Sequence, residues 1–495
     1  MAARREPGFA WRRTWSNHLG NQRIDPLRIY TPTSIEQVSE IVREAETAGV
    51  TARAVGSGHS WSDVALTPGF LLETSGLARP AADGPDFLRE EWRERDLVQT
   101  QAGIRIKELN AWLDGRGLGL LNMGGYDHQT VAGVISTSTH GSGLEFGPLN
   151  DFARSLDIVA AGGAVYRIEP SDGPTDRASF ESHHGGRRTL IQDDHWWRAV
   201  AVGMGCMGVI CGVTLEVRAK YYLREVREFH TWEQVRADLL DGEVLRRNRH
   251  YEVLFSPYHV KHAYPCLVTT RNITTNPSHK PLDKRTRNWG VELASAFPLT
   301  PRIINLLADL KPNWSPRMME SAIRALVKKE YDEVSYKVLN IGTANLLPAY
   351  STEIGVPMDG RHIEAAEAII AVAAERRRLG DVYQSSPISF RFVKASDAYM
   401  SMMNGRDTMM IELIQLSRSD GGYELNAAYE RALSKLDARP HWGQVNNLTA
   451  AGGVLERLYP RYQEWLDVHR QMNSSGVFDS PFTERVGISA ARVAR

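Results

Sequence analysis

The stretch VTARAVGSGHSWSD, residues 50–63, indicates the fold most directly. Its first six residues are expected to form a strand, which runs straight into GSGHS at 56–60. Two glycines just after a strand let the backbone turn tightly and direct N–H groups toward an anion such as a pyrophosphate. The run is not a GxGxxG fingerprint, because Trp61 holds the third glycine position and no helix clearly follows. An ordinary glycine-rich turn with a surface histidine is the alternative.

Helix and strand signals surround this stretch. Apolar residues recur at helical spacing between 35 and 45, Thr33 and Glu36 are expected to form a capping box, and Gly49 stands where the helix should stop. A strand is expected at 97–103 and a helix at 104–113. Gly162 and Gly163 separate LDIVAA from AVYRI, which predicts a hairpin. Residues 20–220 are therefore expected to form one α+β domain.

The composition changes near Tyr221, and the segment 221–440 is predicted to be a second α+β domain. It contains helical runs at 303–310, 318–329 and 363–378, strand-like runs at 387–393 and 408–416, and an amphipathic helix at 423–437. The last segment, 441–495, is expected to be helical and to return to one of the two domains.

Composition excludes several classes of protein. The chain has 495 residues, with 59 Lys+Arg against 59 Asp+Glu, and this balance argues against a nucleic-acid binder. No apolar run approaches the roughly 18 residues of a membrane-spanning helix. Cys206, Cys211 and Cys266 are too sparse for a disulfide framework, and no Cys/His spacing indicates a metal site. A cytoplasmic location is expected, with peripheral attachment to a membrane left open.

Three further runs stand out. VAGVISTSTHGSG (131–143) is small or hydroxylated at nearly every position, so it can lie flat against a planar ligand or form a packed strand and turn. GMGCMG (203–208) matches GxGxxG, but the strand-like VICGVTLEV that follows argues against a nucleotide fingerprint. HWGQ (441–444) can line a pocket or serve packing alone.

These motifs occur in a specific order: GSGHS after a strand, TVAGVISTSTHGSG (130–143), GMGCMGVI (203–210) and RPHWGQ (439–444). Together with FDSPFTERVGI (478–488), they resemble the sugar-lactone and alditol oxidases of the vanillyl-alcohol-oxidase group of flavoproteins. The resemblance implies an α+β, two-domain FAD-binding fold of PCMH type with an α+β cap, and a C-terminal segment that completes the active site.

The resemblance also implies where the cofactor binds. FAD would attach covalently through His59, and the 55–60 loop would hold its pyrophosphate. Gly124, in NMGG at 122–125, would lie near the flavin, where a small residue favours access of O2. The expected cofactor-binding residues are Val55, Gly56, Ser57, Gly58, His59, Ser60, Gly124, Thr130, Gly133, Ser136, Thr137, His140, Gly141, Gly208 and Val209.

The catalytic residues depart from the family pattern. Relatives supply a Glu-x-Arg pair and a Lys from a His-Trp-x-Lys turn. Here Arg391 is present, but Ser389 stands where Glu is expected and Gln444 stands where Lys is expected. Ser389 cannot be a base by itself, and Gln444 carries no charge to stabilise an alkoxide. Substitutes, left unranked, are His441, Glu353 and Glu412.

The resemblance implies an oxidoreductase that takes hydride from a CH–OH group of a lactone or polyol, with reoxidation by O2 or another acceptor. The two departures keep two alternatives open: a specialised oxidase of another hydroxylated metabolite, and a flavin-binding module that has lost catalysis. Arg391 is the strongest catalytic candidate, because a fixed guanidinium orients an oxygen-rich substrate. A purely structural ion pair is its alternative role.

Overall fold

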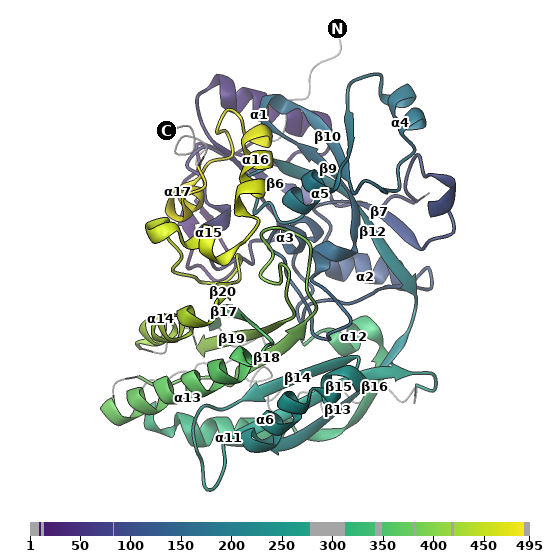
Figure 1. Ribbon diagram of the computed structural model, residues 1–495. Coiled ribbons are helices and arrows are strands. Elements are labelled where there is room, and N and C mark those ends of the chain that lie inside the picture. The colour runs from purple at the N-terminus through teal and green to yellow at the C-terminus, as the bar shows by residue number, and fades with distance from the viewer. Residues whose placement is uncertain are drawn as a thin grey trace.

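The computed structural model describes residues 9–10, 14–82, 84–277, 312–341, 349–380, 382–416 and 420–489. The expected helical run at 303–310 lies outside these residues. Figure 1 shows a sheet-rich upper part built from the first half of the chain, a lower part built on one large sheet, and C-terminal helices that return to the upper part.

The glycine-rich loop follows the edge strand of a four-stranded sheet. The order is β1 (Phe9–Ala10), β4 (Arg28–Tyr30), β6 (Phe70–Glu73) and β5 (Ala52–Val55), and β6 runs parallel to both β4 and β5. Helix α1 (Ile35–Thr47) packs its apolar face on this sheet. The predicted strand and helix are confirmed, but the capping box at Thr33 is wrong. Ser34 is the N-cap, and its side chain accepts a hydrogen bond from the backbone N–H of Gln37.

A second sheet completes the upper part. Its order is β11 (Thr189–Gln192), β10 (Val165–Glu169), β9 (Ala153–Val159), β12 (Val209–Ala219) and β7 (Leu97–Gln101), and β8 (Leu118–Leu120) pairs with β12. The hairpin between β9 and β10 and the helix α2 (Ile106–Asp114) are confirmed.

The expected strand within 131–143 is wrong, because residues 131–136 form the short helix α3 (Val131–Ser136). The hydroxyl oxygen of Thr130 accepts from the N–H of Gly133 and caps this helix. Val131, Val134 and Ile135 are buried in the core, so tertiary packing overrides their preference for strands.

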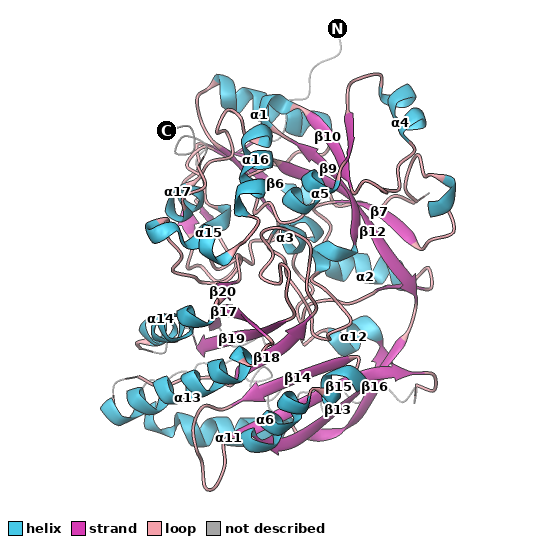
Figure 2. Ribbon diagram, viewed as in Figure 1, coloured by secondary structure: helices cyan, strands magenta, loops and turns pink. Residues whose placement is uncertain are grey.

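The lower part is an eight-stranded sheet with helices on one face (Figure 2). The strands, in spatial order, are β16 (Lys328–Val334), β13 (Tyr222–Thr231), β15 (Pro265–Thr274), β14 (His250–Phe255), β18 (Ile388–Val393), β19 (Thr408–Leu416), β17 (Ala349–Pro357) and β20 (Arg439–Pro440). The covering helices include α6 (Trp232–Asp241), α11 (Ser315–Leu326), α13 (Arg361–Leu379) and α14 (Gly422–Leu433). The predicted boundary at 220/221 falls between β12 and β13, but the division into independent domains stays a prediction.

Strand alternation sorts the residues of this sheet. In β18, Ile388, Phe390 and Phe392 join the core beneath the helices, which turns Ser389 and Arg391 to the opposite face, toward the upper part. The same alternation in β17 and β19 buries apolar residues below and presents carboxylates above.

A row of alternating charges crosses that upward face, and we call it the charge ladder. Its members are Glu225, Arg271, Glu252, Arg391, Glu412 and Glu353. Glu225 lies 2.8 Å from Arg271 Nε, and Arg271 Nη1 lies 2.9 Å from Glu252. Burial lowers the pKa of Arg271, but its two carboxylate neighbours outweigh burial and raise it. Each buried charge is thus held beside an opposite one.

The C-terminal segment returns to the upper part. It carries α15 (Val454–Leu458), α16 (Tyr462–Met472) and α17 (Pro481–Val486). The indole N–H of Trp465 donates to Val202 O at 3.2 Å, and the N–H of Ala52 donates to Val477 O at 2.7 Å.

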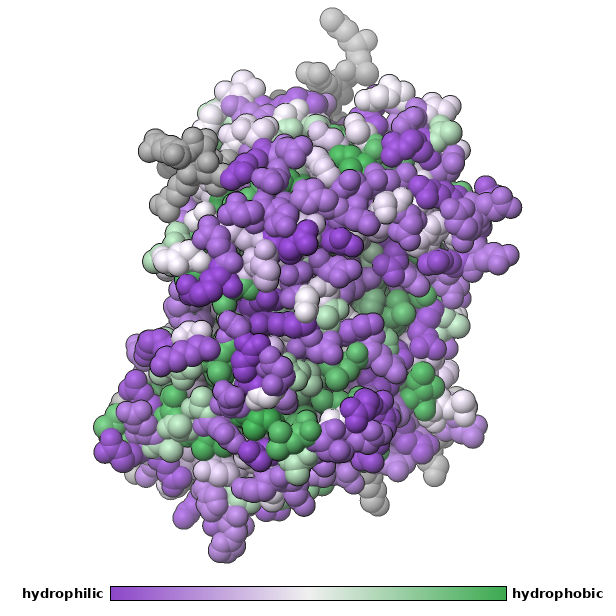
Figure 3. Space-filling model, in the orientation of Figure 1, coloured by the Kyte–Doolittle hydropathy of each residue, from purple (hydrophilic) through white to green (hydrophobic). Residues whose placement is uncertain are grey.

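The surface is polar over most of the face shown in Figure 3, with apolar residues gathered toward the lower part. The three cysteines are free and buried. Among the described helices, none combines the length and the apolar character that crossing a bilayer requires.

We expect a substitution at the centre of the charge ladder to destabilise the folded protein strongly. Arg271→Met removes the cation that Glu225 and Glu252 share, although Arg227 remains 3.0 Å from Glu225 and Arg391 remains 4.0 Å from Glu252, so we expect the free energy of unfolding to fall by about 3 kcal/mol. Urea denaturation followed by tryptophan fluorescence measures this. The matched control is Arg236→Met, which breaks only the half-exposed pair with Glu367 and should cost less than about 1 kcal/mol. Equal effects of the two substitutions would contradict the ladder's role.

Candidate active site

A cleft lies in the upper part, beside the eight-stranded sheet. The 55–60 loop, helix α3, the 204–210 segment and the 441–444 turn line it. Most of the predicted site residues line it, namely Val55, Gly56, Ser57, Gly58, His59, Ser60, Thr130, Gly133, Ser136, Thr137, Gly208, His441 and Gln444.

The 56–60 loop presents free donors to this cleft. Within the described part of the chain, its backbone N–H groups donate no hydrogen bond, although Gly58 O accepts one from His18 N at 2.8 Å. Gly58 has a φ of +68°, a conformation that favours glycine. A Cβ at Gly56 would lie 2.1 Å from Thr130 Oγ1, so the loop packs too closely on the start of α3 for any side chain there. The loop therefore has the form of an anion-binding turn.

His59 stands in a row of rings at the mouth of this loop. Its ring centroid lies 4.5 Å from that of His18 and 4.8 Å from that of Tyr126. Burial, together with the neighbouring charges of His18, His128 and Arg105, lowers the pKa of His59 to about 4. The imidazole is therefore neutral near pH 7, and one ring nitrogen keeps a lone pair for bond formation.

Six predicted residues do not line the cleft: Gly124, His140, Gly141, Val209, Ser389 and Arg391. Val209 is buried in the core, while its neighbour Ile210 faces the cleft. A Cβ at Gly141 would lie 2.5 Å from Met123 O, so close backbone packing accounts for this glycine. The cofactor-binding roles of these residues stay predictions.

Sequence reasoning missed several lining residues, among them Trp15, Arg53, Val64 and Thr74. Arg53 carried a signal, because a charged residue inside a buried strand is rare without a partner. Its guanidinium is 1% exposed and donates to Phe478 O at 3.1 Å, to Met204 O at 2.8 Å and to Val64 O. It thereby ties three distant segments together beneath the loop.

A buried cluster of His140, Glu353 and His441 lies where the cleft meets the large sheet. His140 Nε2 lies 3.3 Å from Glu353 Oε1, and the His441 N–H donates to Glu353 O at 2.8 Å. Burial raises the pKa of Glu353, but the charges of His140, His441 and Arg391 outweigh it and lower the pKa to about 2. Burial also lowers the pKa of His441 to about 4. Glu353 is thus a carboxylate, and His441 a neutral ring.

The three side chains of this cluster have the composition of a metal site, since their ligand atoms lie within 4.8 Å of one another. The hydrogen bonds of the two histidine rings argue against a metal site. The Gly443 N–H donates to His441 Nδ1 at 3.0 Å, so the proton of the neutral ring stays on Nε2. His140 Nδ1 donates to Gly141 O at 2.8 Å, which directs Nε2 to the carboxylate. The protonated Nε2 of His441 is a donor rather than a ligand, so the three side chains do not present a complete set of metal ligands.

Arg391 lies among three carboxylates of the charge ladder. Its Nη2 is 3.2 Å from Glu412 Oε2, its Nη1 is 3.6 Å from Glu353 Oε1, and its Nε is 4.0 Å from Glu252 Oε1. Burial alone would lower its pKa, but these carboxylates raise it, so Arg391 stays a cation. The structural ion pair considered as its alternative role is present, and it also fixes the guanidinium beside the cleft.

Ser389 and Gln444 take different places. Ser389 lies in register opposite Glu412 in the neighbouring strand. Gln444 lines the cleft and accepts a 2.9 Å hydrogen bond from Ser351 Oγ, which also lies 3.2 Å from Glu412 Oε1. Glu412, itself directly opposite Glu353 in β17, is therefore linked to the cleft through Ser351.

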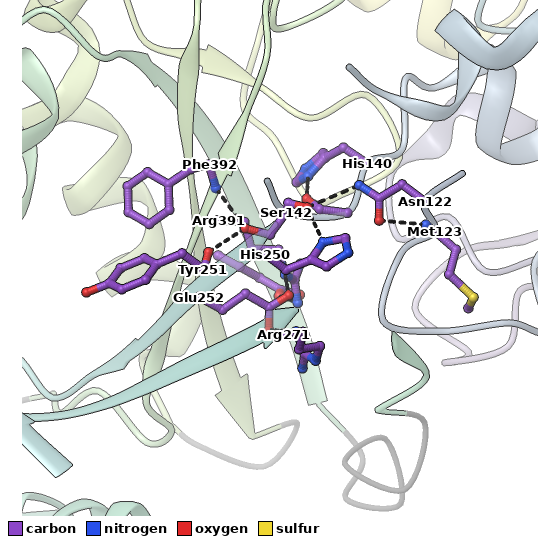
Figure 4. A network of polar contacts seen from close by, with 12 residues as sticks. Asn122, Met123, His140, Ser142, His250, Tyr251, Glu252, Arg271, Arg391 and Phe392 are labelled. Atoms are coloured by element: carbon purple, nitrogen blue, oxygen red, sulfur yellow. Dashed lines mark hydrogen bonds and ion pairs between the residues drawn. The ribbon is translucent and has the colours of Figure 1, made fainter. Parts of the chain in front are cut away.

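Ser142 joins the upper part to the large sheet (Figure 4). Its hydroxyl donates to Tyr251 O at 2.5 Å and accepts from Phe392 N at 3.2 Å, and its carbonyl accepts from Asn122 and His250. These bonds continue the β14–β18 pairing beyond its last rung, Glu252 opposite Arg391. His140, two residues earlier, is thereby held over the charge ladder.

The sequence matches two known protein families. The D-arabinono-1,4-lactone oxidase family model matches residues 213–486, and the model of the FAD binding domain matches 26–169. The chain belongs to the D-arabinono-1,4-lactone oxidase family. The resemblance in the motifs is confirmed, and the chain is an FAD-linked oxidoreductase that acts on CH–OH donors.

Curated relatives match over nearly their whole length. L-gulono-1,4-lactone dehydrogenase of Mycobacterium tuberculosis is 28% identical over 95% of this chain and 98% of its own. L-gulonolactone oxidase of Mus musculus is 24% identical, with 95% and 97% covered. Alditol oxidase of a Streptomyces species is 23% identical, with 94% and 97% covered.

A solved structure shares the fold. Cholesterol oxidase of Brevibacterium sterolicum superposes with a TM-score of 0.75 at 13% identity, and 97% of each chain is covered. This likeness concerns the fold alone, and it confirms the expected α+β FAD-binding fold. The residues of the cleft fit FAD, because the 56–60 loop offers unpaired N–H donors to a pyrophosphate and the cleft has room beside it.

Cofactor retention tests the glycine loop. Gly56→Ala places a methyl group 2.1 Å from Thr130 Oγ1, so the loop or the start of α3 must move. We expect the purified variant to hold several-fold less FAD per chain, measured from the ratio of 450 nm to 280 nm absorbance. Gly119→Ala is the control, because the nearest atom to its Cβ lies 3.7 Å away. Full FAD content in Gly56→Ala would show that the loop does not shape the site.

Proposed function

We propose that this enzyme oxidises a CH–OH group of a sugar lactone or alditol, and that O2 reoxidises the cofactor and yields H2O2. Bound FAD would supply the acceptor for the hydride. The observation that carries the proposal is the fixed Arg391, held among three carboxylates next to a cleft that Gln444 and His441 line. A guanidinium held in this way orients an oxygen-rich substrate by paired hydrogen bonds.

Other residues have supporting roles in this proposal. The 56–60 loop holds the pyrophosphate, and His59 lies where the loop opens on the cleft. The neutral His441 and the ionised Glu353 keep a fixed polar wall at the other end. Gly124 adds no bulk beside Thr139 and His140, which supports access of O2. The relatives differ on the acceptor, since one is named a dehydrogenase and another an oxidase.

The visible spectrum under anaerobic conditions tests this function. We expect L-gulono-1,4-lactone, D-arabinono-1,4-lactone or sorbitol to bleach the 450 nm band, because the substrate reduces the flavin. Admission of air should restore the band and produce H2O2. A band that stays bleached in air would show that an acceptor other than O2 reoxidises the flavin. A band that no member of either class bleaches would contradict the proposal and favour a specialised hydroxylated substrate, which the uncharged Ser389 and Gln444 also allow.

We further propose that His59 carries the flavin covalently. Its neutral imidazole has the free lone pair that a bond to the flavin requires, and burial keeps it neutral at pH values above about 4. Acid-precipitated wild-type protein should remain yellow, whereas precipitated His59→Ala should release its colour to the supernatant. His128→Ala, which changes a more exposed ring of the same row, should stay yellow. Colourless wild-type precipitate would refute the covalent bond.

A further inference from the structure

The proposed oxidation needs a group that accepts the substrate's hydroxyl proton, and residue 389 is a serine. We propose that Glu412 is that group: the carboxylate has moved one strand across the sheet, from β18 to β19. Glu412 then holds the proton, and Ser351 links this carboxyl group by hydrogen bonds to Gln444 at the cleft. This inference rests on the proposed function and names the residue that completes the same site.

Strand register places Glu412 where a carboxylate at 389 would act. Glu412 lies directly opposite Ser389, and strand alternation turns both side chains to the upward face. Arg391 Nη2 lies 3.2 Å from Glu412 Oε2, so the acid and the orienting cation remain a pair. The Glu412 side chain is 15% exposed, whereas that of Glu353 is 4% exposed. Of the two carboxylates, Glu412 is therefore the more exposed.

Ser351 links Glu412 to Gln444 by hydrogen bonds. Its hydroxyl lies 2.9 Å from Gln444 Oε1 and 3.2 Å from Glu412 Oε1, but it has only one hydrogen to donate. All contacts are satisfied when protonated Glu412 donates to Ser351 and Ser351 donates to Gln444. When Glu412 is ionised, the Ser351 hydroxyl donates its hydrogen bond to the carboxylate instead, and a flip of the Gln444 amide turns its NH2 group toward Ser351. These three side chains therefore accommodate both protonation states of Glu412 by rotation of one hydroxyl and one amide.

Electrostatics separates Glu412 from the other candidates. The pKa of Glu353 and that of Glu252 are each lowered to about 2, and that of His441 to about 4, so all three are weak bases. Burial and the adjacent Glu353 charge raise the pKa of Glu412, against the opposing effect of Arg391. Two facing carboxylates whose environments drive their pKa values apart are typical of acid–base sites.

The O–H bond of the substrate breaks and its proton moves to a carboxylate oxygen of Glu412. Bound FAD would accept the C–H hydrogen with its electron pair, while the carbon–oxygen double bond of the product forms. The substrate loses two electrons and the cofactor gains them, so no further reactant is needed.

The first test is anaerobic stopped-flow reduction of the FAD-loaded enzyme by L-gulono-1,4-lactone. Glu412→Gln should slow reduction by about 10²–10⁴-fold with FAD content unchanged, because positioned bases contribute factors of that size. The control Glu375→Gln, on the exposed face of α13, should react like wild type. The wild-type rate should rise with pH as Glu412 ionises, and this rise should disappear in Glu412→Gln.

Rescue distinguishes a proton acceptor from a merely structural group. Ser389→Glu in the Glu412→Gln background returns a carboxylate to the facing position, and it should restore the rate by roughly tenfold or more together with the pH dependence. Wild-type reduction that no lactone or alditol elicits would overturn the proposed function and this inference together. Wild-type reduction that Glu412→Gln retains at full rate and with the same pH profile would overturn this inference alone.

A second measurement is independent of turnover. A carboxyl whose pKa is raised on folding adds stability that is fully present below its unfolded pKa, near 4.5, and lost as pH rises through its folded value. The melting temperature of wild type minus that of Glu412→Gln should therefore decrease as pH rises above 4.5. A difference that does not change with pH would contradict a raised pKa and overturn the proton-accepting role.

Discussion

Charges buried on one face of a sheet must be neutralised by one another, and the arrangement of the large sheet follows from this constraint. Glu225, Arg271, Glu252 and Arg391 succeed one another across β13, β15, β14 and β18, each beside an opposite charge. A one-residue slip of any strand would move its charge to the apolar face under the helices. The ladder therefore fixes the register, and the register fixes which side chains meet beside the cleft.

The ladder ends with an excess of carboxylate. Glu353 and Glu412 face each other at the end near the cleft, and Arg391 alone lies between them. Two adjacent carboxylates cannot both be ionised without cost, so they divide into one that His140 stabilises and one that holds a proton more readily. The extra carboxylate at this end of the charge ladder can therefore accept and release a proton.

The sequence allowed the local features to be predicted and left the long-range ones open. The GSGHS loop, α1 and the strands β18 and β19 follow from glycine placement and hydrophobic period. Helix α3 was missed because Val and Ile favour strands until packing decides otherwise. Glu412 could not be ranked above Glu353, since only the pairing of β17, β18 and β19 reveals which of them faces Ser389. That register depends on contacts between segments that a local pattern does not relate.

The return of the C-terminal segment has a consequence for the timing of assembly. The floor and one wall of the cleft depend on residues near the end of the chain: Gly443 O accepts from Trp61 N, and Phe478 O accepts from Arg53. Arg485 pairs with Asp63, just beyond the loop. A ribosome that has finished the whole FAD-binding half has therefore made an unfinished site. The cofactor cleft takes its final form only after residues 443–485 have been synthesised and have folded back.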